Sequence, residues 1–218
     1  MSPEAARLHA ALPQTQCTRC GYPDCAGYAR AIAAGEADIN QCPPGGAEGI
    51  ARLAHLMRRP AVPLNPAMGV EGPRLMAVID EDWCIGCTLC LDACPTDAIL
   101  GGNKRMHTVI EAYCTGCELC VPVCPVDCIG LENATGDRTG WTAWSQPQAA
   151  EALARYEARK ARKIREAAEH GERMEQEARA KLADLPALTH GAEGAELARK
   201  KAVIEAALAR ARAKRSQP

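Results

Sequence analysis

Thirteen cysteines dominate the chemistry that this chain of 218 residues can perform. All of them lie between positions 17 and 128, in three groups. The second and third groups each follow the pattern C-x2-C-x2-C-x3-C-P, written CIGCTLCLDACP and CTGCELCVPVCP. This run is typical of chains that bind two [4Fe–4S] clusters, since three closely spaced cysteines let one loop bind three corners of a cubane. We expect two such clusters here, with zinc as the alternative.

The fourth cysteine of each run is expected to reach across to the other cluster, as it does in two-cluster ferredoxins. It should also start a helix that leads away from the site. Gly86 and Gly116 lie inside the two loops, where glycine allows backbone N–H groups to approach the sulfurs. Such hydrogen bonds help to set the reduction potential.

The first group has the spacing C-x2-C-x4-C-x16-C-P and contains Cys17, Cys20, Cys25 and Cys42. Zinc is again the alternative, because a C-x2-C pair and a distant cysteine also suit a tetrahedral zinc site. The turn CTRCGYPDC and the neighbouring cluster motifs favour a third [4Fe–4S] cluster. The three groups together predict three clusters and twelve ligands.

Cys128 is the thirteenth cysteine and stands outside both runs, with Ala98 at the equivalent position of the first run. We expect it to be a buried small apolar residue, with a replacement ligand or redox thiol as the alternative. None of the histidines pairs with a cysteine at ligand spacing, so surface or packing roles are expected for His9, His55, His107, His170 and His190.

An internal repeat of thirty residues carries the second and third groups. Each half has a strand-like run (LMAVI, MHTVI), then an aromatic residue, Trp83 or Tyr113, just before the first cysteine. The repeat predicts a pseudo-two-fold βαβ domain of two-cluster ferredoxin type over 74–134.

The remaining segments predict an α+β chain. Alanine-rich helices over 26–36 and 47–59 build a small four-cysteine domain, 10–59, and the proline-rich segment 60–73 reads as a linker. A loop over 134–146, with Trp141 and Trp144 as packing residues, leads to helices over 148–183 and 193–214. Residues 135–218 thus form a loop and a basic, largely solvated helical tail.

Composition places the chain in a reducing compartment. No apolar run suits a secretory signal or a transmembrane helix, so we expect a cytoplasmic protein whose clustered cysteines bind metal rather than form disulfides. Residues 1–150 carry 10 Lys+Arg and 16 Asp+Glu, whereas residues 151–218 carry 16 and 11. The cysteine-bearing part is acidic and the tail is basic, which is a clue about partners.

The order of motifs resembles one family closely. LPQTQC, the CGYP turn, INQCPPGG and the double run ending in CPVDCI are similar to the B subunit of the Rnf/Rsx electron transport complex over residues 10–135. The family member usually begins with a membrane-spanning helix. Here about twelve residues precede LPQTQC and include Pro3, Glu4, Arg7 and His9, so we expect a form without that helix.

The resemblance implies electron transfer between a soluble carrier and membrane subunits that couple it to ion transport. Carried over by motif, it implies one cluster on Cys17, Cys20, Cys25 and Cys42. It implies a second on Cys84, Cys87, Cys90 and Cys124, and a third on Cys94, Cys114, Cys117 and Cys120.

Partners should therefore be redox proteins: either soluble ones, for a free ferredoxin-like carrier, or membrane subunits, for a protein peripheral on the inner face of the plasma membrane. No nucleotide-binding loop, nucleophile motif or other substrate site is visible, so a catalytic site of its own is not expected. The alternative is a nucleic-acid-binding protein with structural clusters, suggested by RKARKIR and RARAKR in the tail. Few aromatic residues lie there for stacking, which disfavours it.

Overall fold

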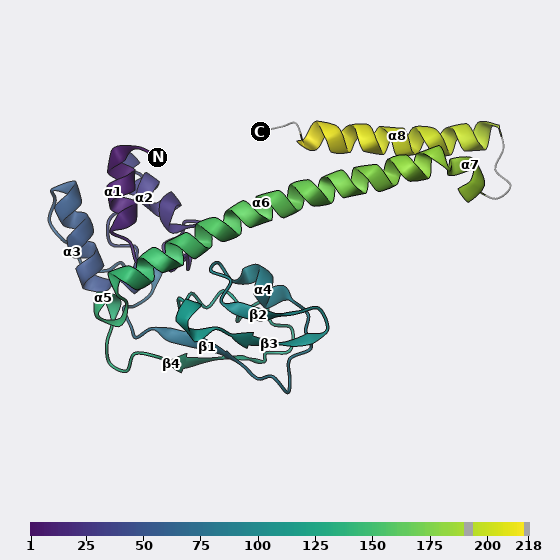
Figure 1. The fold of residues 1–218 in the computed structure, drawn as a ribbon. Helices are drawn as coiled ribbons and strands as arrows, with labels where there is room; N and C mark the ends of the chain where they lie inside the picture. The colour runs from purple at the N-terminus through teal and green to yellow at the C-terminus, as the bar shows by residue number, and fades with distance from the viewer. Residues whose placement is uncertain (190–193, 216–218) are drawn as a thin grey trace. The chain divides into compact units, whose positions relative to one another are not determined.

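The computed structural model describes residues 1–189 and 194–215. Its contacts divide the chain into two compact units, Met1–Arg159 and Lys160–Pro218. All thirteen cysteines belong to the first unit. Figure 1 shows the helices and strands with the labels used below.

Three helices build the four-cysteine region: α1 (Pro3–Ala10), α2 (Cys25–Ala34) and α3 (Gly46–Met57), with the 3-10 helix η1 (Pro43–Gly45) after the last cysteine. The predicted helices over 26–36 and 47–59 are confirmed, whereas α1 was not expected. Asp24 caps α2 by accepting the N–H of Gly27 at 2.6 Å. Gly35 ends α2 in the left-handed conformation, at φ 72°.

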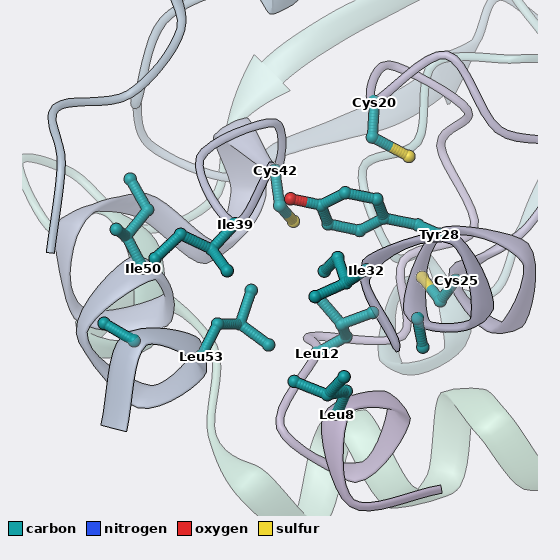
Figure 2. Packing of buried hydrophobic residues seen from close by; sticks show 12 residues of the cluster. Leu8, Leu12, Cys20, Cys25, Tyr28, Ile32, Ile39, Cys42, Ile50 and Leu53 are labelled. Carbon is teal, nitrogen blue, oxygen red and sulfur yellow. The ribbon is translucent and has the colours of Figure 1, made fainter. Parts of the chain in front are cut away.

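These helices enclose an apolar core. Leu8 and Leu12 meet Ile32 of α2 and Leu53 of α3, and all are at most 2% exposed. Figure 2 shows these side chains pointing toward one another, with the Tyr28 ring beside them. The region therefore has conventional packing in addition to its cysteines.

The segment 60–73 contains a short 3-10 helix, η2 (Pro66–Met68). At its end, the Glu71 carboxylate accepts the N–H of Ala47 in the first turn of α3 and the hydroxyl of Thr139, both at 2.8 Å. A carboxylate is favourable at a helix N-terminus because the first N–H groups there lack intrahelical partners. The segment is thus fixed to α3 at one point.

The repeat forms two antiparallel strand pairs. The elements are β1 (Leu75–Ile79), α4 (Leu89–Ala93), β2 (Ile99–Gly102), β3 (Arg105–Val109), the 3-10 helix η3 (Glu111–Tyr113) and β4 (Ile129–Asn133). β1 pairs with β4, from Leu75 opposite Asn133 to Ile79 opposite Ile129. β2 pairs with β3, so the first strand of each half pairs with the last strand of the other. Both strand-like runs are confirmed, within a mixed fold of helices and small sheets.

The helical part of the βαβ expectation is wrong in two respects. The second half has turns where the first has α4, because Pro122 stands at the position of Asp92 and cannot donate a backbone hydrogen bond. In addition, α4 precedes Cys94 instead of starting at it. The chain turns directly into β2 after Cys94, with Asp97 in the left-handed region at φ 50°.

The same close contact between a glycine and a strand occurs in both halves of the repeat, at positions thirty residues apart. A Cβ on Gly86 would lie 2.5 Å from the backbone N of Arg105, and one on Gly116 would lie 2.6 Å from the carbonyl O of Leu75. Both glycines have positive φ, 67° and 70°. Each loop therefore requires glycine at this position, because a strand of the other half lies against it.

The expected loop over 134–146 contains a short helix, α5 (Gly140–Ala143). Thr139 and Thr142 form a reciprocal capping box that accounts for it. Trp141 and Trp144 are buried, as predicted, and pack with Ala149 and Ala152 at the start of α6. The Trp144 indole N–H donates to the carbonyl of Pro13 at 2.8 Å, which joins this segment to the first ligand loop.

The helical tail is confirmed as α6 (Gln146–Ala183), α7 (Leu185–Leu188) and α8 (Ala195–Arg215), and α6 runs from the first unit into the second. Within the second unit, i,i+4 pairs such as Arg162–Glu166 and Lys200–Glu196 stabilise solvated helices. His190 lies outside the described residues. None of the helices described is both long and apolar enough to cross a membrane.

Candidate iron–sulfur sites

The first candidate site gathers the four cysteines of the first group. The charges of Cys17 and Cys20 act on the pKa of Cys25, and all three act on the pKa of Cys42, so the side chains are electrostatic neighbours. All four are buried. The structure thus brings together one complete predicted ligand set.

Two buried glutamines shape the loop that enters this site. Gln16 accepts the backbone N–H of Cys25 at 2.9 Å and donates to Gln14 at 3.1 Å. Gln14 and Gln16 have positive φ, 59° and 53°, which is costly for residues other than glycine. The hydrogen bonds hold this strained backbone in place, which gives the QTQ of LPQTQC a structural role.

Tyr28 positions the fourth cysteine of the group. Its hydroxyl donates to the carbonyl of Asp38 at 2.7 Å and accepts the N–H of Gln41 at 3.0 Å, directly before Cys42. The ring is 1% exposed, and burial raises the pKa of the phenol. Figure 2 shows the ring between Cys20 and Cys42. Sequence reasoning missed this residue, because its spacing indicates only a helical core position.

A second set combines the two halves of the repeat. Cys94 lies in the first half, yet it lines one cavity together with Cys114, Cys117 and Cys120 of the second half. The charge of Cys94 also acts on the pKa values of Cys117 and Cys120. The backbone N–H of Ala98 donates to the Cys94 sulfur at 3.1 Å. This is the arrangement expected when a fourth cysteine crosses to the other cluster.

The last set contains Cys84, Cys87 and Cys90 from the loop before α4, and the first two act on the pKa of the third. His107 on β3 contacts this set although no sequence signal indicated it. Its backbone N–H donates to the Cys84 sulfur at 3.4 Å, and its ring Nδ1 lies 3.3 Å from the Cys90 sulfur. Gly101 makes room for the ring, since a Cβ there would lie 1.9 Å from it. His107 is buried, so its expected packing role agrees with its position.

Cys124 and Cys128 lie together beside the last set. Their sulfurs are 3.4 Å apart, and the backbone N–H of Cys128 donates to the Cys124 sulfur at 3.4 Å. Cys128 is buried and also interacts with Cys84. Because Cys124 contacts Cys128, and Cys128 interacts with Cys84, Cys124 lies near the ligand loop of the first half.

Burial raises the pKa of several of these thiols. It raises the pKa values of Cys25, Cys117 and Cys120 to about 12 and that of Cys42 well above its usual range. Thiolates so disfavoured need a cationic centre to be stable, and the irons of a cluster supply it. The donor set therefore fits iron–sulfur clusters.

No three Cys, His, Asp or Glu side chains converge on a single point, as around one metal ion, within the described residues. A cubane has four separate irons that each bind one thiolate, so its ligands surround a volume.

The first and third ligand loops pack against each other. Thr115, between Cys114 and Cys117, donates its hydroxyl to the carbonyl of Thr15 at 3.0 Å. Arg19, in the first loop, forms an ion pair with Glu118 at 2.5 Å. Both loops are therefore held together by a buried hydrogen bond and a half-exposed ion pair.

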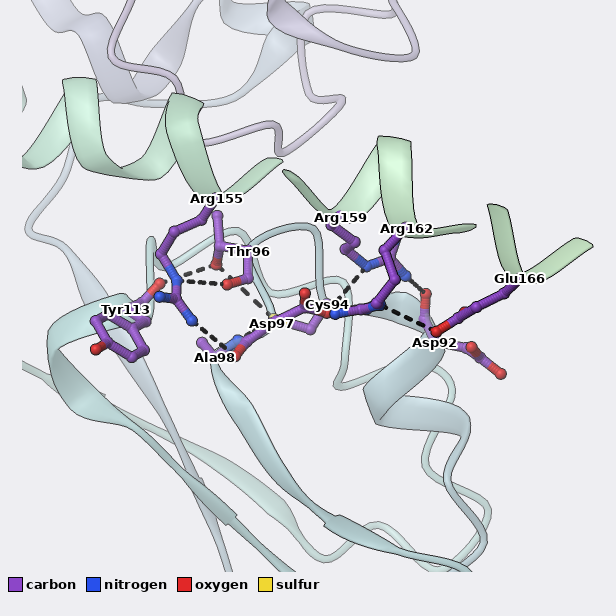
Figure 3. A network of polar contacts seen from close by, with 10 residues as sticks. All are labelled: Asp92, Cys94, Thr96, Asp97, Ala98, Tyr113, Arg155, Arg159, Arg162 and Glu166. Atoms are coloured by element: carbon purple, nitrogen blue, oxygen red, sulfur yellow. Dashed lines mark hydrogen bonds and ion pairs between the residues drawn. The ribbon is translucent and has the colours of Figure 1, made fainter. Parts of the chain in front are cut away.

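Helix α6 braces the repeat with arginines (Figure 3). The Arg155 guanidinium donates to the carbonyl oxygens of Thr96 and Asp97, at 2.8 and 3.4 Å, and lies 3.4 Å above the Tyr113 ring. Arg159 pairs with the Asp97 carboxylate at 3.4 Å and donates to the carbonyl of Asp92. The turn after Cys94 is thus held from outside, by residues whose sequence resembles the solvated tail.

Comparison with known proteins agrees with these sites. The family model for a 4Fe-4S dicluster domain matches residues 77–131, and the FeS model for an Fe-S cluster matches residues 12–44. The matches contain every candidate ligand.

Relatives in several bacteria are named as the B subunit of an ion-translocating oxidoreductase complex. The one from Azoarcus sp. (strain BH72) is 59% identical over 141 residues, which are 65% of this chain and 76% of the relative. The one from Hahella chejuensis is 54% identical over 147 residues, 67% and 74% of the two chains. The one from Thiobacillus denitrificans is 58% identical over 107 residues, 49% and 57%.

The chain belongs to the family of B subunits of ion-translocating oxidoreductase complexes. Within this family it is an iron–sulfur protein of electron transfer, and the resemblance found in the sequence is confirmed. The nucleic-acid-binding alternative is not favoured.

Proposed function

We propose that the chain relays electrons through three [4Fe–4S] clusters as a subunit of a membrane-bound, ion-translocating oxidoreductase. Each cluster, when bound, takes up and releases one electron. The ligand sets are those implied by the motifs: Cys17, Cys20, Cys25 and Cys42; Cys84, Cys87, Cys90 and Cys124; and Cys94, Cys114, Cys117 and Cys120. We propose the domain limits 10–59, 60–73, 74–134 and 135–218 for these parts.

The observation that carries this proposal is the cavity shared by Cys94 with Cys114, Cys117 and Cys120. A thiolate of one half that lies among three thiolates of the other half is placed to be the fourth ligand of the cluster that the other half binds. The backbone N–H of Ala98 donates to the Cys94 sulfur at 3.1 Å, so the chain supplies a hydrogen bond for a thiolate there.

Iron analysis of anaerobically purified protein tests the number of clusters and the ligands. We expect about twelve irons per chain and low-temperature electron paramagnetic resonance signals of reduced [4Fe–4S] centres. Cys94→Ser should lose about four irons or convert one centre to a three-iron form. Cys128→Ser is the matched control, since Cys128 is equally buried but lies outside the ligand sets. Equal iron in both variants would contradict the proposed ligands.

Fractionation of the source cells tests membership of the complex. The chain should sediment with membranes that contain integral redox subunits, and a salt wash should release it if charge holds it there. Recovery of the whole amount as a free soluble protein would contradict the complex and leave the electron-carrier function.

A further inference from the structure

The two ligand loops of the repeat differ sharply in their surroundings. Thr115 of the third-group loop is 3% exposed, because it contacts the four-cysteine region through Thr15. The residue thirty positions earlier is Ile85, which is 57% exposed. One loop is covered from within the chain, while the equivalent position of the other faces solvent.

The exposed loop is apolar. Trp83 and Leu89 flank Ile85 and are 69% and 47% exposed, so three large apolar side chains lie open within seven residues. Their equivalents are less exposed: Tyr113 lies under the Arg155 guanidinium, and Leu119 is half-buried. Exposed apolar groups beside a functional site are characteristic of protein-binding surfaces.

An acidic groove adjoins this loop. Trp83 and Cys128 line it together with three carboxylates, those of Asp80, Asp127 and Glu132, and none of the described residues that line it is Lys or Arg. Glu81 and Asp82 add two further exposed carboxylates directly before Trp83. The equivalent positions of the other half are Ile110, Glu111 and Ala112, so of the three acidic residues before Trp83 only Glu81 has an acidic counterpart there.

We propose that an external redox protein docks on a surface formed by Trp83, Ile85, Leu89 and the acidic groove. When docked there, it lies close to Cys84, Cys87 and Cys90, in the same way that the four-cysteine region lies close to the third-group loop. The partner is a protein with an exposed redox group inside a basic rim. Its positive charges match the carboxylates, and its apolar centre covers Trp83 and Ile85. This inference rests on the proposed electron-relay function.

Stopped-flow electron transfer tests the surface, with cytochrome c as a small basic acceptor. Dithionite-reduced protein is mixed with oxidised cytochrome c at an ionic strength of about 0.01 M, where the Debye length is about 30 Å. Glu81→Lys combined with Glu132→Lys should slow the second-order reaction at least about fivefold, because steering depends on charge near the docking site. The matched control combines Glu36→Lys with Glu111→Lys, which changes the same net charge elsewhere, and should slow it less than about twofold.

The apolar centre has its own pair of variants. Ile85→Thr gives the exposed loop the hydroxyl residue type of Thr115, and should slow the reaction about two- to threefold. Val70→Thr is the control, since Val70 is 78% exposed and lies outside the surface. Equal rates for the two single variants, together with equal slowing by the two charge pairs, would overturn the docking surface.

Iron content and bleaching by dithionite separate the two proposals. If wild-type protein holds its iron and is reduced, yet the variants fail to differ, the docking surface alone is wrong. If wild-type protein neither binds iron nor accepts electrons after cluster reconstitution, the proposed function itself is wrong.

Discussion

The four-cysteine region and the repeat use cysteine differently. The core of the first contains twelve buried residues, of which three are cysteines, and the rest are mainly leucine, isoleucine, alanine and Tyr28. The core of the repeat contains ten, and five are cysteines. All of those five except Cys128 belong to the proposed iron ligands. The difference indicates that apolar packing supports the first region, whereas the repeat depends on its clusters for folding energy.

Removal of iron should produce the largest difference between the two regions. Anaerobic chelation is expected to unfold the repeat, because its buried thiols would lose their cationic partners and leave a core with few large apolar residues. Hydrogen exchange should accelerate at least about tenfold in β1 and β4, and much less in α1 and α3. Equal acceleration in both regions would show that the apolar core does not stabilise the first region independently.

Truncation of the first core should have the next largest effect. Leu53→Ala removes a side chain that is 1% exposed and should lower the free energy of unfolding by about 2–5 kcal/mol. Chemical denaturation of the cluster-loaded protein, followed by α-helical circular dichroism, measures it. Leu131→Ala on β4 serves as a control, because that side chain is 37% exposed and should cost less than about 1.5 kcal/mol.

Substitution of Arg155 on α6 tests how far the stability of the repeat depends on contacts with that helix. Arg155→Ala removes two hydrogen bonds to carbonyl oxygens and the contact with the Tyr113 ring, and should cost about 1–3 kcal/mol. Cluster release on heating should begin at lower temperature. Arg165→Ala offers the comparison, since its pair with Glu169 is exposed and contributes about 0.3–0.5 kcal/mol. Identical melting of both variants would contradict the brace.

The pH dependence of His9 should be the smallest effect. Burial lowers the pKa of this histidine below 6.5, although Asp24 opposes the shift, and its buried Nε2 has no hydrogen-bond partner among the described residues. Since the unfolded chain then binds the proton more readily, stability should be full above 6.5 and fall as the pH drops toward the lowered pKa. A nuclear magnetic resonance titration of the ring measures it, and a pKa above 6.5 would show that the charge of Asp24 outweighs burial at this histidine.

Short-range patterns predicted much of the molecule. The spacing of the cysteines indicated the three groups, and alanine-rich periodicity indicated α2, α3 and the long helices of the tail. These signals are local, because a loop around a cubane and a helical turn both depend on residues a few positions apart.

Contacts between distant segments could not be predicted in the same way. Arg155 and Tyr156 belong by composition to the solvated tail, yet Arg155 supports the turn after Cys94 and the Tyr156 hydroxyl donates to Asp24 at 3.0 Å. His107 reaches the Cys90 sulfur because Gly101 leaves space across the hairpin. Pro122 did carry a signal: its missing N–H marks the half without an α-helix.

The crossing of Cys94 into the cavity of the other half has a consequence for biosynthesis. With the proposed ligand sets, neither site of the repeat has four thiolates before synthesis has reached Cys120. At that point the site that contains Cys94 is complete, and the site that contains Cys84 is complete only after Cys124. A nascent chain that ends before Cys120 therefore offers iron-delivery proteins two incomplete sites, although every cysteine of the first half has been made. Maturation of the repeat thus begins only when nearly all of it exists. A copy cut short before Cys120 holds no intact centre there from which electrons leak to oxygen.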